Sequence, residues 1–524
     1  MTDLINASTV FRALAPELLL IAGALVLLLA SVWVPQHAAS GRAEGAERTS
    51  TIARFGVVLC LLVALVVAIM WGDGVPGTDD QRIAGDGFRW AMDLVLLMGG
   101  AFALMLLDQD HLHSGSYGPE SPVLLLLALS GMMILVAARD LILVFLGIEL
   151  MSVAVYVLAG SNRFSGRSAE ASIKYFLLGA VASGFLLYGM ALMYGASGST
   201  RFVDIAAWIG AHPGLSPLFL AGIALLLVGF GFKVAAAPFH LWTPDVYEGA
   251  PLPVTAFMSA CVKTAAFGAL ARTMIEVLPT AMPRWHQGVW WLAAVTMVVG
   301  NVLALSQRNL VRLLAYSSVA HAGYLLVAVL VGGPAGTSAL VFYAVSYTLA
   351  TMGAFAVLIS VGAGREGPLM IDDIAGLWLV QPGLATAMAV CLFAFLGMPF
   401  VGGMGFFAKW YVLQSALQAS SPQTILAIIL VVTSAVSAAY YLGVVSAMFM
   451  RARTEGARHP IASPVLRSLI AVSVGIILVL GVYPTPVMNV ARQALTGASL
   501  SAGPGQEAAP ASAPRLQAAD YIAP

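Results

Sequence analysis

Long runs of apolar residues recur along almost the whole chain, separated by short polar stretches. A helix of roughly 20 apolar residues crosses the roughly 30 Å hydrocarbon core of a bilayer. The runs therefore predict an all-α integral membrane protein with about 14 transmembrane helices. We expect them at about 13–34, 52–71, 91–107, 122–138, 140–159, 171–195, 216–240, 253–275, 287–306, 311–332, 337–362, 382–417, 424–449 and 464–484.

Two of these spans contain helix-breaking residues. In the seventh, GFGFKVAAAPFHLW, Pro238 follows Lys233 by five residues and removes a backbone hydrogen bond. The twelfth run is too long for one straight span and contains LGMPFVGGMGFFAKW, with Pro399, Gly402, Gly403 and Gly405 before Lys409. Broken helices at membrane depth survive where their backbone faces protein or water, so both predict ion-handling sites.

The two breaks lie five spans apart, which indicates an inverted repeat. An odd offset reverses the orientation of the second unit, as in inverted-topology transporters. The predicted division is 1–120 for spans 1–3, 121–275 for the first repeat (spans 4–8), 287–449 for the second repeat (spans 9–13), 450–490 for a loop and span 14, and 491–524 for a disordered tail. The tail is rich in Ala, Ser, Gly and Pro, a composition that cannot build a core.

Composition supports the membrane class and excludes others. The 524 residues are 60% hydrophobic and 10% charged, whereas soluble domains carry about 25% charged residues. The formal net charge of zero argues against nucleic-acid binding. Three isolated cysteines without metal-ligand spacing argue against a disulfide, zinc or an iron–sulfur cluster on this chain. We expect no cleaved signal peptide, because the N-terminus lacks a basic leader.

The arginines lie mainly in the predicted loops between spans. Twelve lie on one side of the membrane, and seven lie on the side that also holds the N-terminal segment. The positive-inside rule then places the N-terminus outside the cell. The four lysines, in contrast, all fall in predicted spans: Lys174, Lys233, Lys263 and Lys409. Arginine stays charged in proteins, whereas a buried lysine can release its proton. The lysines therefore predict a proton-handling interior.

Other titratable residues lie at similar depth. Lys263 is about ten residues into its span, which corresponds to about 15 Å, and Glu149 is the one mid-span carboxylate. We expect Glu149 to control proton binding at Lys233 by moving toward or away from it. His321 is also mid-span and can pass a proton near neutral pH.

Simpler interpretations stay open for each residue. Lys174 lies near the start of its span and can extend its amine to the interface. His240 lies beside Trp242, where an interfacial hydrogen bond explains it equally well. His321 can be a hydrogen-bonded core residue, and the lysines can form static ion pairs with Glu149. Two deep histidines could also ligate haem, but no other feature supports haem.

The motifs together resemble a known family. FKVAAAPFHLWTPDVYEGAP, SACVKTAAF, LAYSSVAHAGYLL and GMPFVGGMGFFAKW are similar to segments of the proton-translocating, antiporter-like subunits of respiratory complex I. The resemblance covers about 120–450. It implies fourteen spans, two inverted five-helix repeats, and broken seventh and twelfth helices.

The resemblance also implies roles and partners. By motif match, Glu149, Lys233, Lys263 and Lys409 are the family's proton-handling residues, with His321 between them and with Lys174 and His240 as further candidates. Lys409 stands where one branch has glutamate, and no long lateral helix follows span 14; both features favour a shorter, lysine-bearing branch. The family implies small subunits and another antiporter-like subunit as membrane-arm neighbours. NADH, FMN, iron–sulfur clusters and quinone would belong to those partner chains.

The expected function is proton translocation, driven by quinone reduction elsewhere, in the bacterial plasma membrane. Two alternatives share the same motifs. The chain could serve a multi-subunit cation/proton antiporter or a hydrogenase-linked membrane complex, or it could be a structural spacer with an idle polar axis. Co-purifying proteins distinguish the first alternative, and replacement of all four key residues distinguishes the second.

Overall fold

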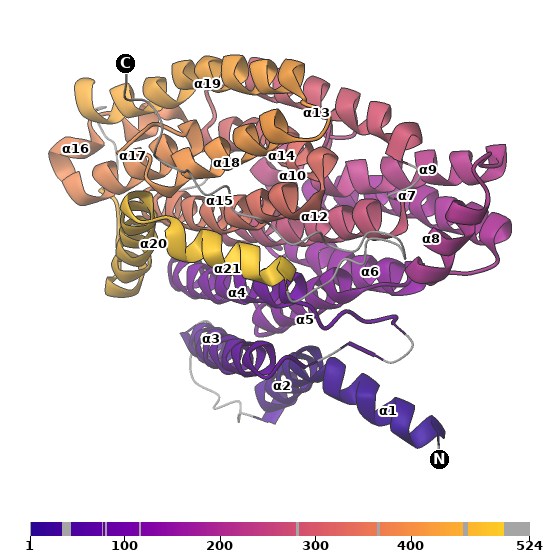
Figure 1. Cartoon of the computed structure of the whole chain (residues 1–524). Helices are drawn as coiled ribbons and strands as arrows, with labels where there is room; N and C mark the ends of the chain where they lie inside the picture. The colour runs from indigo at the N-terminus through magenta and orange to yellow at the C-terminus, as the bar shows by residue number, and fades with distance from the viewer. Residues whose placement is uncertain are drawn as a thin grey trace, which may run out of the picture.

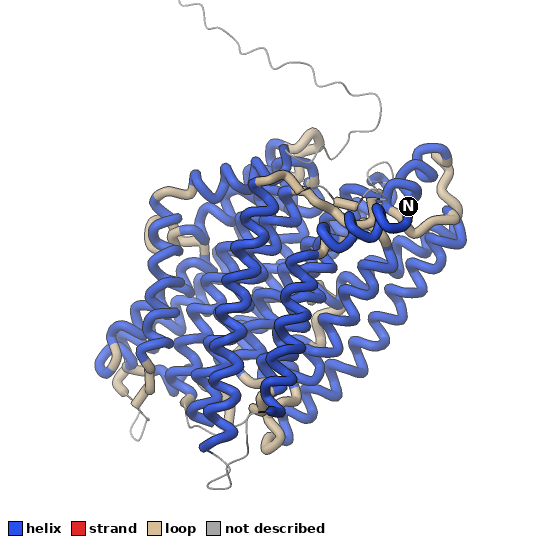
Figure 2. Tube along the Cα trace, turned by 90° about the horizontal axis from the view of Figure 1, so that it is seen from below, coloured by secondary structure: helices blue, strands red, loops and turns tan. Residues whose placement is uncertain are grey.

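The chain folds into a bundle of helices that run side by side (Figure 2). The computed structural model describes residues 2–33, 43–75, 77–78, 81–114, 117–278, 282–363, 367–453 and 459–496. Within these ranges the only extended pairings are three isolated bridges. In this part of the chain, thirteen helices are long and apolar enough to span a membrane, and the predicted twelfth run forms two shorter helices. The predicted all-α membrane class is confirmed.

The long helices correspond to the predicted runs in order. Their bounds are α2 (Ala15–Trp33), α3 (Ala43–Gly72), α4 (Gly87–Ser114), α5 (Glu120–Ala137), α6 (Leu141–Ala159), α7 (Gly166–Ser197), α9 (Pro217–Val234), α11 (Leu252–Phe257) continued by α12 (Lys263–Arg272), α13 (Met282–Leu305), α14 (Leu310–Val331), α15 (Gly333–Gly362), α17 (Pro382–Leu396), α18 (Met404–Gln418), α19 (Thr424–Met450) and α20 (Pro464–Val482).

Shorter helices were not predicted from hydropathy. They are α1 (Thr2–Ala13), α8 (Phe202–Ala211), α10 (Thr243–Gly249), α16 (Leu377–Val380), the 3-10 turn η3 (Ile371–Ile374) and α21 (Thr485–Thr496). Each is too short or too polar to give a membrane signal. The predicted disordered tail began near residue 490, but α21 extends to Thr496, and 497–524 lie outside the described residues.

Side-chain caps fix the starts of several spans. The Asp140 carboxylate accepts from the backbone N–H of Ile142 at the start of α6, and Asn309 does the same at the start of α14. Such caps satisfy backbone donors that a helix leaves unpaired. Ser216 caps α9, and Pro217 follows at the first helical position, where its missing N–H is harmless.

Close helix crossings depend on small residues. A Cβ atom on Gly300 of α13 would lie 2.4 Å from the backbone nitrogen of Ala320 on α14. No side chain fits there, so the two helices approach backbone to backbone along their length. This contact matters for function because α14 carries His321.

The two predicted breaks are present. Helix α9 ends at Val234, and Ala235 takes a left-handed φ of 59°. The chain then runs without regular α-helix through Trp242, and α10 begins at Thr243. The second break separates α17 from α18, and Gly397 (φ 74°) and Gly403 (φ 52°) provide its left-handed turns. Glycine tolerates this region without steric penalty.

The eighth span departs from a regular α-helix. Its turn η1 (Met258–Val262) is π-helical and leads directly into Lys263, and a second π-helical turn, η2 (Thr273–Val277), ends the span. Single π-helical turns are frequent at functional sites. This irregularity was not predicted from the hydropathy pattern.

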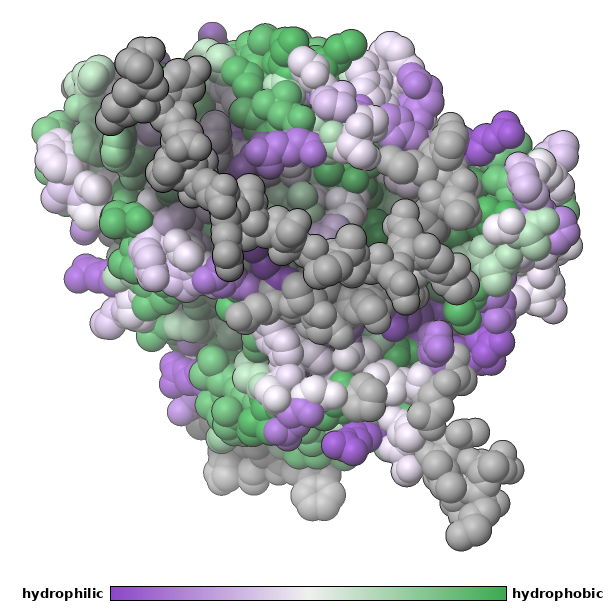
Figure 3. Space-filling view, in the orientation of Figure 1, coloured by the Kyte–Doolittle hydropathy of each residue, from purple (hydrophilic) through white to green (hydrophobic). Residues whose placement is uncertain are grey.

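The N-terminal helices α1 to α3 lie at one edge of the bundle, and α13 and α19 lie at the opposite edge (Figure 1). Helices α11, α12, α14 and α15 lie inside, and the eighth span is buried throughout. The hydrophobic surface over α19 is visible at the upper edge of Figure 3. Large apolar side chains of α3 and α7, such as Phe55 and Phe176, are also exposed, as expected for helices that face lipid or a partner. The predicted division into repeats stays a prediction.

Candidate functional site

Lys233 lies in the last turn of α9, immediately before the first break, and is buried. Its Nζ atom donates to Ser152 Oγ at 2.7 Å and to Tyr156 OH at 3.1 Å, both on α6. The amine also lies 5.4 Å from the centroid of the Tyr156 ring. The Lys233 amine is therefore bound by two hydroxyl groups and an aromatic ring rather than by an acidic side chain.

Glu149 lies one turn before Ser152 on the same helix and is half-buried. It accepts a 2.5 Å hydrogen bond from Ser183 Oγ on α7 and makes no ion pair with Lys233 within the described ranges. A static Glu149–Lys233 pair is therefore not formed. The Glu149 carboxylate therefore bridges α6 and α7 through Ser183 and stays partly exposed.

Lys263 begins α12 directly after the π-helical turn and is buried. Its Nζ atom donates to the backbone oxygen of Ser318 at 2.7 Å and to Ser318 Oγ at 2.9 Å. Ser318 belongs to α14, in the predicted second repeat. The amine of one predicted repeat is thus bound by the other.

His321 lies one turn after Ser318 on α14, and its ring is buried. Nδ1 lies 2.6 Å from Tyr343 OH, and Nε2 lies 3.2 Å from Tyr441 OH. The Tyr441 hydroxyl also contacts Ser317 Oγ. A ring flanked by hydroxyls on both nitrogens can accept a proton at one and release it at the other.

Lys409 lies on α18 after the second break. Its Nζ atom donates to the backbone oxygen of Leu396, the last residue of α17, at 3.0 Å and to Ser434 Oγ on α19 at 2.9 Å. The amine lies 4.7 Å from the centroid of the Tyr324 ring. Since Tyr324 follows His321 by three residues, both lie on one face of α14.

These residues form a buried polar row that we call the α14 row: Lys263, Ser318, His321, Tyr324 and Lys409. Tyr324 OH extends the row by accepting from Asn301 Nδ2 at 3.1 Å. The three amines of Lys233, Lys263 and Lys409 have no carboxylate within ion-pair distance in the described part of the chain. Hydrogen bonds to neutral oxygens leave these amines free to titrate.

Lys174 and His240 lie outside this row. Lys174 is 43% exposed and forms ion pairs with Glu170 (2.7 Å) and with Asp245 on α10 (3.0 Å). Arg312 joins the same cluster through Asp245 at 2.9 Å. His240 is buried in the first break, and its Nδ1 atom lacks a hydrogen-bond partner among the described residues. A proton-carrying role for Lys174 and His240 stays a prediction.

Several contacting residues were missed from sequence. Ser152 and Tyr156 hold Lys233, and Tyr343 and Tyr441 hold His321. Within α14, Ser318 lies three residues before His321, a spacing that already indicates one helix face. The tyrosines on other helices carried no such signal, because their distance to His321 depends on packing.

Metal coordination is not indicated in the described ranges, where no group of three or more His, Cys, Asp or Glu side chains lies close enough to hold an ion. The three cysteines are buried as free thiols.

Comparison with known proteins identifies relatives over the whole chain. Residues 138–437 match the family model "NADH:quinone oxidoreductase/Mrp antiporter, TM". The NADH-quinone oxidoreductase subunit N of Gemmatimonas aurantiaca is 67% identical, and the alignment covers 99% of each chain.

Solved structures agree on the fold. A chain of respiratory complex I from Thermus thermophilus with bound aureothin superposes with a TM-score of 0.76 at 35% identity, covering 91% of this chain and 99% of that chain. A chain of the Mrp complex from Dietzia sp. superposes with a TM-score of 0.78 at 22% identity, covering 93% and 97%. The second likeness shows the fold alone. Because the family model matches more than half of the chain and the Gemmatimonas relative is 67% identical over 99% of both chains, the chain belongs to the NADH-quinone oxidoreductase subunit N family of antiporter-like membrane proteins.

Proposed function

We propose that this chain conducts protons across the membrane as a membrane-arm subunit of NADH-quinone oxidoreductase. The observation that carries the proposal is the set of three buried lysine amines without carboxylate partners, Lys233, Lys263 and Lys409. A buried ammonium needs strong compensation to persist, and a lysine that lacks it exchanges its proton readily. Its hydroxyl neighbours accept hydrogen bonds from the charged and the neutral amine alike.

The proposed path follows the α14 row. A proton enters from the cytoplasm at the first break, near Lys233, and passes to Lys263. From there Ser318 and His321 lead toward Lys409, with Tyr343 and Tyr441 holding the His321 ring between them. Rearranged side chains or water must complete the steps, because proton transfer requires hydrogen-bond contact.

Glu149 is proposed as the control element. In the described arrangement its carboxylate is held by Ser183 and does not contact Lys233. Motion of α6 or a new charge on a neighbouring subunit would change the field at Lys233, since Coulomb interactions are strong in a low-dielectric interior. The half-exposed position of Glu149 supports contact with such a neighbour.

The energy for transport comes from other subunits in this proposal. Moving one charge against the membrane potential costs about 2.3 kcal/mol per 100 mV, and this chain has no redox motif. NADH, FMN, iron–sulfur clusters and quinone would reside in partner chains; the name of the Gemmatimonas relative mentions NADH and quinone. Small membrane subunits and a second antiporter-like subunit would flank the chain in the bacterial plasma membrane.

A role in a cation/proton antiporter is the second candidate, because the matching family model also covers Mrp antiporters. The α14 row argues for protons, since its lysines offer no oxygen ligands to a metal cation. Flavin and iron–sulfur subunits that co-purify with the chain would support the first proposal over the second.

The proposed function is tested by Lys263→Ala in the assembled complex reconstituted into vesicles. We expect proton pumping to fall while NADH oxidation by artificial acceptors continues. Arg163→Ala, which removes an exposed arginine from an interfacial ion pair, is the matched control. Full pumping by Lys263→Ala would reject the assignment.

A further inference from the structure

A second buried charged cluster lies far from the lysines in sequence, where α2 meets α4. Arg89, in the first turn of α4, is fully buried. Its guanidinium donates to the backbone oxygen of Ala84 at 2.6 Å, to that of Ala13 at 2.8 Å, and to Glu17 Oε1 on α2 at 2.7 Å. Its Nε atom lies 3.4 Å from Asp93 Oδ2, one turn further along α4.

This cluster contains one cation and two acids. Glu17 and Asp93 are 1% and 0% exposed, and Arg89 is the one guanidinium that contacts either of them in the described residues. Both oxygens of Asp93 lack a hydrogen-bond partner among the described groups, as does Glu17 Oε2. Two buried carboxylates therefore compete for one arginine, and Asp93 has the poorer contact.

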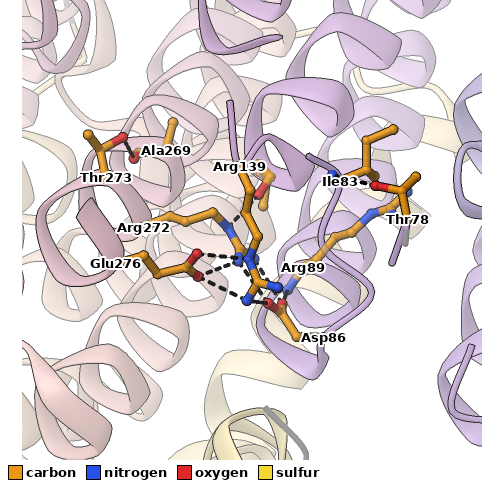
Figure 4. A network of polar contacts seen from close by, with 10 residues as sticks. Thr78, Ile83, Asp86, Arg89, Arg139, Ala269, Arg272, Thr273 and Glu276 are labelled. Atoms are coloured by element: carbon orange, nitrogen blue, oxygen red, sulfur yellow. Dashed lines mark hydrogen bonds and ion pairs between the residues drawn. The ribbon is translucent and has the colours of Figure 1, made fainter. Parts of the chain in front are cut away.

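The neighbouring cluster cannot supply the missing charge (Figure 4). There Arg272 donates to both oxygens of Asp86, and Arg139 bonds both Asp86 and Glu276. Arg272 also bonds Glu276 at 2.6 Å. The two positive charges of these arginines are therefore already compensated by the two carboxylates.

The two clusters meet where the Arg89 backbone N–H donates to Asp86 Oδ1 at 2.9 Å. Together they hold three guanidinium groups and four carboxyl groups. The charged groups that act on Asp93 are Arg89 on its own helix, Glu17 from α2 and Arg272 from α12. If every group were ionised, one negative charge would remain uncompensated inside the protein.

A buried carboxylate without a partner is strongly unfavourable, and such a group takes up a proton instead. Glu17 receives the direct hydrogen bond from Arg89 and so keeps its charge. Asp93 is fully buried and lacks a hydrogen-bond donor among the described residues, so Asp93 is the position where neutralisation removes the largest penalty.

We propose that Asp93, Glu17 and Arg89 form a second proton-binding site, separate from the lysines, in which Asp93 holds one proton as a neutral carboxylic acid. The site lies on the helix that packs against the Lys263-bearing span. A Cβ atom on Gly99 of α4 would lie 2.5 Å from the sulfur of Cys261, two residues before Lys263. The two proton-binding regions thus share one tight helix contact.

The test is infrared spectroscopy of the purified, assembled complex, which separates the C=O stretch of a protonated carboxylic acid from carboxylate bands. Asp93→Asn should remove one acid band. Glu17→Gln should remove the same band, because Asp93 then ionises as the sole partner of Arg89. Asp73→Asn, at an exposed position, should leave the band in place.

Thermal melting of the same complexes gives an independent readout. Asp93→Asn should melt near the wild-type temperature, because an amide replaces a neutral acid of the same shape, whereas Asp86→Asn should melt lower. An acid band that survives both Asp93→Asn and Glu17→Gln would overturn the proposal. So would a wild-type band that disappears when sodium or potassium is added, since a bound cation would then occupy the site. If Asp93→Asn fails to assemble, Glu17→Gln decides the question: loss of the acid band supports the proposal, and persistence of the band overturns it.

Discussion

Gly397 and Lys409 are in contact across the second helix break. A Cβ atom on Gly397 would lie 2.8 Å from Cδ of Lys409, and Gly397 has a left-handed φ of 74°. The glycine therefore does two things: it turns the chain after α17, and it leaves room for the lysine to fold back onto the carbonyl oxygen of Leu396. The same glycine therefore determines both the turn of the backbone at the break and the position of the Lys409 amine.

Gly397→Ala should weaken both functions. A non-glycine residue in the left-handed region costs about 1–2 kcal/mol, and the added methyl displaces the Lys409 side chain. We expect a lower melting temperature and reduced pumping by the reconstituted complex. Gly383→Ala in α17, where a Cβ atom would meet nothing within 4 Å, is the control; equal effects of the two variants would refute this explanation.

Tyr441→Phe should slow proton transfer along the α14 row. The substitution keeps the aromatic ring but removes the hydroxyl that contacts both His321 and Ser317. A barrier raised by about 1.4 kcal/mol slows a step about tenfold, and we expect a loss of pumping of at least that order. Tyr188→Phe, on the exposed face of α7, should pump normally. A normal rate for Tyr441→Phe would exclude its hydroxyl from the path.

Glu149→Gln should remove the negative charge of Glu149 while keeping its hydrogen bond to Ser183. The amide still accepts the hydrogen bond from Ser183, so assembly and melting temperature should be preserved. Loss of the negative charge should reduce pumping, because the field at Lys233 no longer responds to motion of α6. Glu170→Gln, at an exposed acid, is the comparison. Wild-type pumping by Glu149→Gln would show that its charge is not used.

Asp86 should link stability to acidic pH. Burial raises the pKa of Asp86, but the guanidinium groups of Arg272 and Arg139 outweigh it and hold the pKa below the ordinary value. A carboxyl group with a lowered pKa stabilises the fold above the unfolded-state value of about 3.9, and this contribution is lost as pH falls through the folded-state pKa.

Asp86→Asn should therefore lower stability near neutral pH, by about 3–5 kcal/mol for a broken buried ion pair. It should also flatten the dependence of melting temperature on pH in the acidic range. Melting curves of the complex between neutral and acidic pH measure both effects, with Asp73→Asn as the exposed control. An unchanged acidic slope in Asp86→Asn would contradict the role of this carboxylate.

The sequence predicted the crossings and the breaks because both depend on local properties. Apolar length determines whether a helix can span the bilayer, and proline or glycine interrupts it wherever it occurs. The same local argument located Lys233, Lys263 and Lys409 at depth. It did not find the π-helical turn before Lys263, since no residue type encodes that turn.

Partner choice was decided by packing alone. The hydrogen-bond partners of the Lys233 amine, Ser152 and Tyr156, were not predicted from the sequence, and control of Lys233 by Glu149 stays a prediction. Lys263 bonds Ser318, 55 residues away in sequence, and Arg89 bonds Glu17, 72 residues away. A hydrogen bond requires donor and acceptor within about 3 Å, and only the tertiary arrangement of the helices sets such distances. The sequence by itself determined which residues enter the membrane and how the helices break; the fold decided which of those residues meet.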